Sequence, residues 1–314
     1  MAFTREEQLW LAKKLREPKN LPQMLPENYL DCLDEVDMRE ITIPTRVGDS
    51  RCYLTKPIGG AKNDVLIINI HGGGFVQHHY TPDNAICAIY ALELGCTVLD
   101  IDYRVAPEYP YPAAMYECYD VLQWCAKNAD MLGVSPDKMV MSGNSAGAVL
   151  AANAAMLAAE EDGAAPAMVV MLYPAADMRL DPALASYDGR AEDLDLTDLA
   201  TRCSLYTRLY TDEDAALADD GHINLLNATA EQLSRFPETL VITAGSDPLR
   251  ADGEQFALRI LESGSAVTLK CYLGSAHGFY VRCIGPDWYE ARNFVMANIC
   301  RKFGIEHKVW RAYK

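Results

Sequence analysis

The sequence has no apolar run long enough to cross a membrane, no C-x-x-C pair and no cluster of basic residues. The first absence argues against a transmembrane protein, since a membrane-spanning helix needs about 20 consecutive apolar residues. Lys and Arg number 28 against 44 Asp and Glu, which gives a net charge of −16. Such a surface repels nucleic acid and anionic membranes, so we expect neither as a stable partner.

The ten cysteines follow no metal-ligand spacing, and several lie in apolar periodic runs, among them Cys118, Cys125 and Cys271. We expect them to be buried free thiols in a reducing compartment. The segment from Met1 to Glu7 lacks the apolar core of a signal peptide. The expected location is therefore the cytoplasm, and no cofactor or metal is expected.

Apolar strand-like stretches alternate with helix-like stretches along most of the 314 residues. The strand-like stretches are 65–70, 96–102, 139–141, 167–174, 239–245 and 267–273, and the helix-like ones are 84–94, 113–129, 148–159, 252–264 and 286–303. This alternation predicts an α/β fold with a doubly wound, mostly parallel sheet. The length fits one large α/β domain with insertions.

Two regions depart from this alternation. Residues 3–35 are predicted to be helical with proline interruptions, and Val36–Ile43 and Arg51–Thr55 to form a hairpin through Gly48. Residues 176–235 are rich in Asp and indicate helices on an insertion.

The sequence G-x-S-x-G occurs at 143–147, between an apolar strand and an alanine-rich helix. This pattern is the nucleophile elbow, in which a sharp turn exposes the serine hydroxyl above the sheet. Ser145 is therefore the candidate nucleophile, and an ordinary strand–helix turn is the alternative that the pattern alone leaves open.

A serine hydroxyl needs a base to take its proton, and the base is usually histidine. Three histidines follow Ser145 in the chain: His222 in the insertion, His277 after the last strand, and His307 beyond the last helix. Only His277 stands where a loop can hold it over the sheet. His78 and His79 are adjacent, so their side chains diverge, which disfavours a zinc site.

The acid that orients the base is expected between the serine and the histidine, as in α/β-hydrolases. Asp247 directly follows a strand, although it is also suited to a simple turn role ahead of Pro248. Asp252 is the nearest rival, but it falls inside the following helix.

A tetrahedral intermediate needs N–H donors at its negative oxygen. His71-Gly72-Gly73-Gly74 matches the HGGG loop that supplies such donors, because glycines let the backbone turn its N–H groups inward. Ala146, next to the serine, is expected to add a further N–H group.

Five segments in order, HGGGF at 71–75, YRVAPE at 103–108, GNSAG at 143–147, SDPLRADG at 246–253 and HGF at 277–279, resemble the hormone-sensitive-lipase-like esterases of the α/β-hydrolase superfamily. The resemblance covers roughly residues 60–300. It implies a single α/β-hydrolase domain over 1–314, with a helical cap built from about 1–45 and an insertion at about 176–235.

The same resemblance implies a serine carboxylesterase with Ser145, Asp247 and His277 as its triad. It also implies an oxyanion hole formed by the N–H groups of Gly73, Gly74 and Ala146. His71 and the pair Tyr103-Arg104 would then support the loop and the neighbouring turn.

The sequence departs from the family pattern at Asn144, where the family usually has Asp or Glu, and at R-A-D-G in 250–253, where D-E-G is usual. The expected substrate is a small short-acyl ester. Alternatives are deacetylation of acetylated sugars or aryl amides and, from a different class, a non-catalytic small-molecule receptor on the same fold. The final strand could be a sheet edge, which would suit a homodimer.

Overall fold

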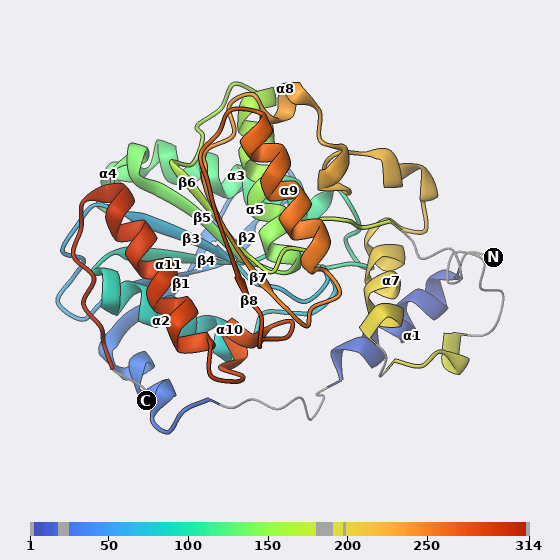
Figure 1. Ribbon diagram of the computed structural model, residues 1–314, viewed down its shortest axis with the longest axis horizontal. Coiled ribbons are helices and arrows are strands. Elements are labelled where there is room, and N and C mark those ends of the chain that lie inside the picture. The colour runs from blue at the N-terminus through green and yellow to red at the C-terminus, as the bar shows by residue number, and fades with distance from the viewer. Residues whose placement is uncertain (1–2, 18–24, 180–190, 197–198, 312–314) are drawn as a thin grey trace.

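One sheet of eight strands runs through the molecule, in the order β1-β2-β4-β3-β5-β6-β7-β8 (Figure 1). The computed structural model describes residues 3–17, 25–179, 191–196 and 199–311. The strands are β1 (Val36–Ile43), β2 (Ser50–Pro57), β3 (Leu66–Ile70), β4 (Thr97–Asp102), β5 (Met139–Asn144), β6 (Met168–Leu172), β7 (Glu238–Ala244) and β8 (Val267–Tyr272).

The predicted hairpin and the predicted parallel sheet are both confirmed. β1 and β2 pair antiparallel with Ile43 opposite Ser50, and Gly48 takes a φ of 108° in the turn between them. β2 also pairs antiparallel with β4, whereas the pairs from β4 through β3, β5, β6 and β7 to β8 are parallel. The carboxyl ends of the parallel strands therefore meet at one edge of the sheet.

Long helices cover both faces of this sheet, as a doubly wound fold requires. One face carries α3 (Ala113–Lys127), α5 (Ala146–Glu160) and α9 (Arg250–Glu262), and the other carries α2 (Thr81–Leu94) and α11 (Trp288–Phe303). Successive strand residues point to opposite faces, so Ile68 packs in the first core and Ile67 in the second. The strand side chains are buried on both faces, which explains the continuous apolar runs of the strands.

The shorter helices lie between these elements. They are α4 (Ala129–Leu132), α8 (Ala230–Leu233), α10 (Phe279–Arg282) and the 3₁₀ segments η1 (Tyr29–Glu35), η2 (Pro136–Lys138), η3 (Ala191–Asp193), η4 (Ala215–Asp219) and η5 (Leu225–Asn227).

Two helices from distant parts of the chain lie side by side beyond the sheet, α1 (Arg5–Arg16) and α7 (Leu199–Tyr210) (Figure 1). We call them the cap helices. α1 begins at a capping box, in which Thr4 and Glu7 exchange backbone and side-chain hydrogen bonds. α1 and η1 fall in the segment 3–35 that was predicted to be helical, and β1, which follows, belongs to the main sheet. Residues 18–24, with two of the interrupting prolines, and 180–190 of the insertion lie outside the described residues.

All ten cysteines are free thiols, and eight of them are buried. Cys203 and Cys271 are half-buried rather than buried, in contrast to our expectation. Cys203 lies on the cap helix α7, and Cys271 lies on β8, an edge strand that has a neighbour on one side only. Among the helices in the described ranges, none is both long and apolar enough to cross a membrane.

Candidate active site

Ser145 stands alone between the end of β5 and the start of α5, with φ 54° and ψ −119°. Such a conformation is strained for a residue with a side chain and is typical of functional sites. The N–H of Ser145 donates to the Leu172 carbonyl at 2.8 Å, which holds the turn against β6. Gly147 must be glycine, because a Cβ there would lie 2.1 Å from the carbonyl oxygen of Ile70. The elbow predicted at 143–147 is thus formed.

The structure brings Ser145, Asp247 and His277 together at the carboxyl edge of the sheet. The Nε2 atom of His277 lies 3.0 Å from Oγ of Ser145, and its Nδ1 lies 2.7 Å from Oδ2 of Asp247. The three residues follow β5, β7 and β8, whose carboxyl ends lie at the same edge of the folded sheet, with β6 between β5 and β7. Both ring nitrogens of the imidazole are therefore engaged in one continuous hydrogen-bonded chain.

Asp247 makes both of the contacts that the sequence left open, one to the predicted base His277 and one within the turn that follows β7. Its Oδ1 accepts the N–H of Leu249 at 2.9 Å, while Oδ2 faces His277. The carboxylate is almost fully buried, with 1% of its side chain exposed. The hydrogen bond from Leu249 fixes the orientation of the carboxylate, and the carboxylate in turn fixes the orientation of the imidazole.

The rival residues are used elsewhere. His222 contacts Oδ1 of Asn153 at 3.3 Å and Oε2 of Glu160 at 3.2 Å, which ties the insertion to α5. Nε2 of His307 lies 2.9 Å from Oε2 of Glu93, in the last turn of α2. Asp252 lies in the first turn of α9, where burial and the neighbouring Asp177 raise the pKa of its carboxyl.

The glycine loop faces the elbow from the end of β3. The N–H groups of Gly73 and Gly74 make no hydrogen bond to any residue that the structure describes. Ala146 is the first residue of α5, and the N–H groups of a first helical turn have no intrahelical acceptor. The three predicted donors are therefore free to bind a negative oxygen.

His71 and Tyr103 form the support under this loop. Their rings stack with centroids 4.2 Å apart, and the Tyr103 hydroxyl donates to the His71 carbonyl at 3.2 Å. Nδ1 of His71 lies 2.8 Å from the Gly72 carbonyl. Burial lowers the pKa of His71 to about 4, so the ring is neutral near pH 7.

Asn144, the departure from the family pattern, lies directly beside the glycine loop. A Cβ on Gly72 would lie 2.4 Å from the side-chain oxygen of Asn144, so these two residues are in contact. The amide brings no charge to a place where the family usually has a carboxylate. Within the described residues, no three His, Cys, Asp or Glu side chains gather as a metal site would require.

Tyr173 is a contact of the triad that the sequence analysis missed. Its ring meets the His277 ring edge to face, with centroids 5.0 Å apart, and its backbone takes a φ of 39°. Tyr173 directly follows β6, so the same rule that selected Asp247, a polar residue at a strand end, could have singled it out.

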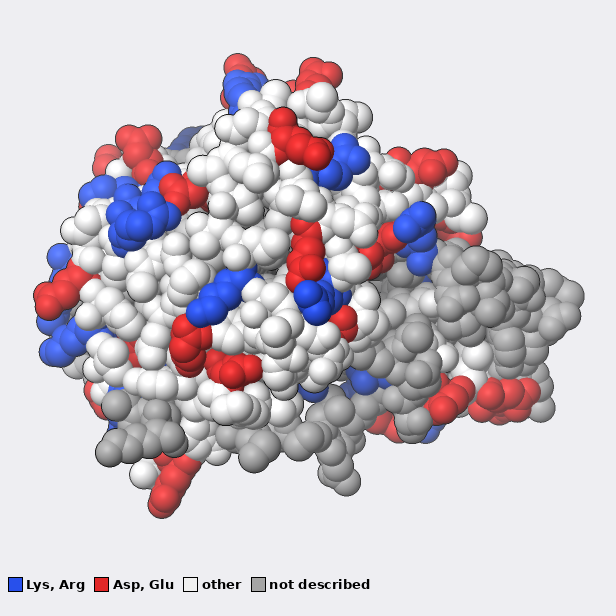
Figure 2. Space-filling model, viewed as in Figure 1, with Lys and Arg blue, Asp and Glu red and all other residues white. Residues whose placement is uncertain are grey.

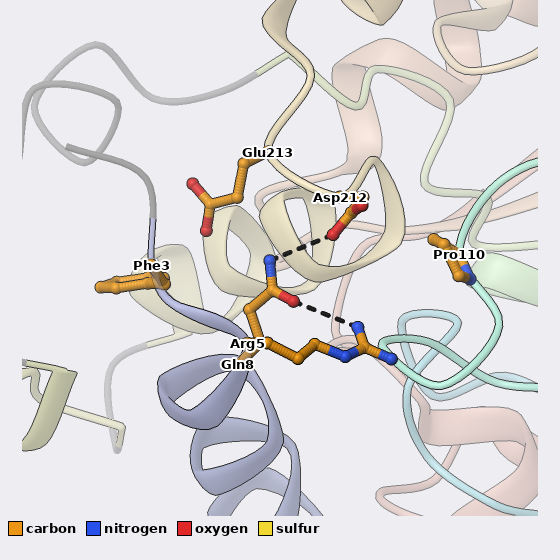
Figure 3. A pocket seen from close by; sticks show the side chains of 6 residues that line it. All are labelled: Phe3, Arg5, Gln8, Pro110, Asp212 and Glu213. Carbon is orange, nitrogen blue, oxygen red and sulfur yellow. Dashed lines mark hydrogen bonds between the residues drawn. The ribbon is translucent and has the colours of Figure 1, made fainter.

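An open hollow of about 430 Å³ lies away from the triad, between the start of α1 and the end of α7 (Figure 3). Its lining residues are Phe3, Arg5, Gln8, Pro110, Asp212 and Glu213. Gln8 stands at its centre, donating to Asp212 at 3.1 Å and accepting from Arg5 at 3.2 Å. None of the three triad residues lines this hollow, so it is separate from the candidate active site.

Comparisons with known proteins agree with this geometry. Residues 67–281 match the family described as alpha/beta hydrolase fold. The carboxylic ester hydrolase LipN of Mycobacterium tuberculosis is 34% identical over 250 residues, which cover 78% of this chain and 64% of that protein. An arylesterase of Saccharolobus solfataricus is 32% identical over 69% of each chain. Our chain thus spans about two thirds of the length of these two curated relatives.

A solved structure is similar over nearly its whole length. The hyperthermophilic esterase from the archaeon Pyrobaculum calidifontis superposes with a TM-score of 0.76 at 30% identity, covering 95% of this chain and 98% of that one. The sheet order, the elbow and the Ser–His–Asp contacts define a hydrolase of the α/β class. The chain belongs to the α/β-hydrolase family, in the hormone-sensitive-lipase-like group of carboxylic ester hydrolases.

Proposed function

We propose that this protein is a serine carboxylesterase that cleaves short-acyl esters through an acyl-enzyme intermediate, with Ser145 as nucleophile, His277 as base and Asp247 as its orienting acid. The observation that carries the proposal is the unbroken chain of contacts from Oγ of Ser145 through both nitrogens of His277 to Asp247, at 3.0 and 2.7 Å. The names of the curated relatives, a carboxylic ester hydrolase and an arylesterase, support the same reaction class.

The reaction follows from these contacts. Oγ of Ser145 attacks the ester carbonyl carbon as its proton passes to Nε2 of His277, and the carbonyl oxygen becomes an oxyanion. The N–H groups of Gly73, Gly74 and Ala146 would bind that oxygen. The intermediate collapses, the C–O bond to the alcohol breaks, and His277 gives the alcohol its proton. Water then attacks the acyl-serine by the same route and releases the carboxylic acid.

The preference for short acyl groups is supported by the close packing of α7 on the glycine loop. The Tyr206 ring of α7 lies so close to Gly74 that a Cβ on that glycine would be 2.2 Å from its Cγ atom. We propose that the cap limits the acyl pocket in this way. It would be built from the part of the expected segment 1–45 that precedes β1, and from about residues 176–235, over one α/β-hydrolase domain. α1 and α7 would be its main described elements.

Replacement of Ser145 by Ala tests the function. We expect kcat with p-nitrophenyl acetate to fall by several orders of magnitude, since the hydroxyl has no substitute. A fluorophosphonate probe should label the wild-type protein at Ser145 and leave the variant unlabelled. Near-normal turnover by the variant would refute the proposed nucleophile, and a wild-type protein that neither turns over esters nor takes the probe would favour a non-catalytic receptor.

We also propose a cytoplasmic homodimer. Ten free thiols support a reducing compartment. The open edge of β8 and the neighbouring α9 expose four leucines, namely Leu258, Leu261, Leu269 and Leu273. Figure 2 shows uncharged surface on the face that α9 and α11 form, with a few charged side chains among it. We expect light scattering to give the mass of a dimer, and Leu269→Lys to give a monomer; a monomeric wild type would contradict the dimer.

A further inference from the structure

Helix α7 packs directly on the glycine loop at two consecutive positions. The Tyr206 ring lies over Gly74, and the Tyr210 ring stacks on Phe75 with centroids 3.9 Å apart and planes 8° apart. Phe75 and Tyr210 are both fully buried. The two residues that follow Gly73 therefore both pack against the cap helix α7.

Helix α1 holds the next two positions of the same loop. Nε of Arg16 donates to the Val76 carbonyl at 2.8 Å, and the side-chain amide of Gln77 donates to the Leu15 carbonyl at 2.5 Å. Carbonyls in the last turn of a helix have no intrahelical donor, so the end of α1 is suited to this contact. Each of the residues 74–77 thus contacts at least one of the two cap helices.

Gln77 is the point where both cap helices meet the loop. Its Nε2 lies 2.5 Å from the Leu15 carbonyl oxygen of α1 and 3.0 Å from the Tyr206 hydroxyl of α7. Arg202 donates to the same hydroxyl at 2.8 Å, which leaves the Tyr206 oxygen with two side-chain partners. Both hydrogens of one amide group are therefore used to join the two cap helices.

The backbone of Gln77 fixes the glycine loop itself. Its N–H donates at 2.9 Å to the Gly73 carbonyl, which also accepts the N–H of Val76 at 3.2 Å. The Cβ of Gln77 would lie 2.4 Å from a Cβ on Gly73. The peptide that joins Gly73 to Gly74 is planar, and in a trans peptide the C=O and N–H bonds point in opposite directions. The hydrogen bond to the Gly73 carbonyl therefore fixes the orientation of this peptide plane. The Gly74 N–H, in the same plane, then points in the direction opposite to that carbonyl.

We propose that Gln77 is a positioning residue of the oxyanion hole: its side chain, fixed by Leu15 and Tyr206, holds its backbone so that the Gly74 N–H stays aimed at the developing oxyanion. This inference rests on the proposed esterase function and extends it. The cap then acts on the chemical step, besides any part it has in admitting substrate. Gln77 itself does not touch the reacting atoms.

The test compares the wild type with Gln77→Met, which keeps the length of the side chain and removes both of its donors. We expect kcat for p-nitrophenyl acetate to fall about tenfold. A tenfold loss exceeds the effect that removing one neutral hydrogen bond usually has. It is smaller than the loss of about 10²–10³ in kcat that follows deletion of an oxyanion-hole donor. KM should stay within about twofold, and the loss should be equal for acetyl and butyryl esters, because the acyl pocket is unchanged.

An aryl trifluoromethyl ketone supplies the second readout, since it forms a tetrahedral adduct on an active serine. Its Ki should rise by the same factor by which kcat/KM falls. The acid limb of the pH profile of kcat/KM should not move, because His277 and Asp247 keep their contacts. Loss of fold alone would lower the active fraction and leave Ki unchanged.

Two variants serve as controls. Gln123 of α3 makes the same kind of contact away from the site, donating to the Ala164 carbonyl at 2.9 Å and accepting the Ala164 N–H at 2.8 Å. Gln123→Met should lose stability to a similar degree with kcat unchanged. Tyr206→Phe removes one hydrogen bond of Gln77 and keeps the ring on Gly74, so we expect a smaller loss of kcat in the same direction. Combined with Gln77→Met, it should add little.

Two results would overturn the inference: a Gln77→Met enzyme whose kcat and ketone affinity stay within about twofold of wild type, or a Gln123→Met enzyme that loses kcat equally. Both are distinct from failure of the proposed function. That failure would appear first in the wild type, as absent turnover and absent labelling of Ser145.

Discussion

The carboxylate of Asp247 lies 2.7 Å from Nδ1 of His277 and is held in place by the N–H of Leu249, which its other oxygen accepts at 2.9 Å. One residue thus orients the imidazole and closes the turn that leads into α9. The carboxylate can keep the Nδ1–H tautomer of His277, which leaves Nε2 to accept the serine proton.

Replacing Asp247 by Asn separates these two roles. The amide oxygen can still accept the Leu249 N–H, whereas the charge that stabilises the imidazolium is gone, so we expect kcat to fall by about 10³–10⁴ with the fold intact. The matched control is Asp252→Asn, which changes the rival carboxylate five positions on and should leave kcat within about threefold. Equal losses in the two variants, measured with p-nitrophenyl acetate, would remove Asp247 from the triad.

Asp83 gives a prediction for stability against pH. Its carboxylate, 1% exposed, accepts the Tyr80 N–H at 3.1 Å at the start of α2. Burial, reinforced by the charge of Asp100, raises the pKa of Asp83 from 3.8 to about 8. The folded protein therefore keeps a proton that the unfolded chain loses above about pH 4, so this residue lowers stability progressively as pH rises to about 8.

Asp83→Asn keeps the hydrogen bond to Tyr80 and removes the titration. Between about pH 5 and about pH 8, we expect the free energy of unfolding of the variant to rise by about 2–4 kcal/mol relative to that of the wild type, as measured by urea unfolding. Because both proteins share every other group, the difference between them isolates Asp83. A difference that stays constant across this range would show that Asp83 ionises as freely in the folded state as in the unfolded chain.

Asn144 gives a prediction for the pH dependence of turnover. Its amide packs on Gly72 and precedes Ser145, so Asn144→Asp places a negative charge next to the site. A nearby carboxylate favours the protonated form of a histidine. We expect the acid limb of kcat/KM to move to higher pH by a few tenths of a unit, and the shift to shrink in high salt because charges near the surface are screened. An unchanged profile, or a shift to lower pH, would contradict this.

The ion pair of Glu93 with Arg292 gives a prediction for stability. The two side chains are 3.1 Å apart with 0% and 1% of their area exposed, and His307 lies 2.9 Å from the second Glu93 oxygen. Glu93→Gln leaves the Arg292 charge buried opposite a neutral amide, which we expect to cost about 3–5 kcal/mol in urea unfolding. Glu238→Gln, which breaks the more exposed contacts of Glu238 with Arg301 and Lys302, should cost less than about 1 kcal/mol. If the two variants lost similar free energies of unfolding, burial would not be what makes the Glu93–Arg292 pair important for stability.

The sequence predicted those parts of the molecule that local pattern and chain order determine. Apolar runs marked the strands, and the order serine, acid, histidine selected Ser145, Asp247 and His277 from many acids and several histidines, because parallel strands end at one edge. Cys271 was placed wrongly because an apolar run does not reveal whether its strand lies at the edge of the sheet.

The contacts of the cap could not be predicted in the same way. Gln77 follows the glycine loop as an ordinary polar residue, and Tyr206 is one of several tyrosines in the insertion. Their contact joins residues 129 positions apart and depends on how α1 and α7 dock. Such docking is set by tertiary packing, which leaves no periodic signal in either segment.

The most direct test of the central claim is to stop turnover of p-nitrophenyl acetate within milliseconds by acid and to map the protein by mass spectrometry. The proposed chemistry predicts an acetyl group on the peptide that contains Ser145, formed together with a burst of p-nitrophenol. Turnover without that adduct, or an adduct confined to another residue, would contradict it.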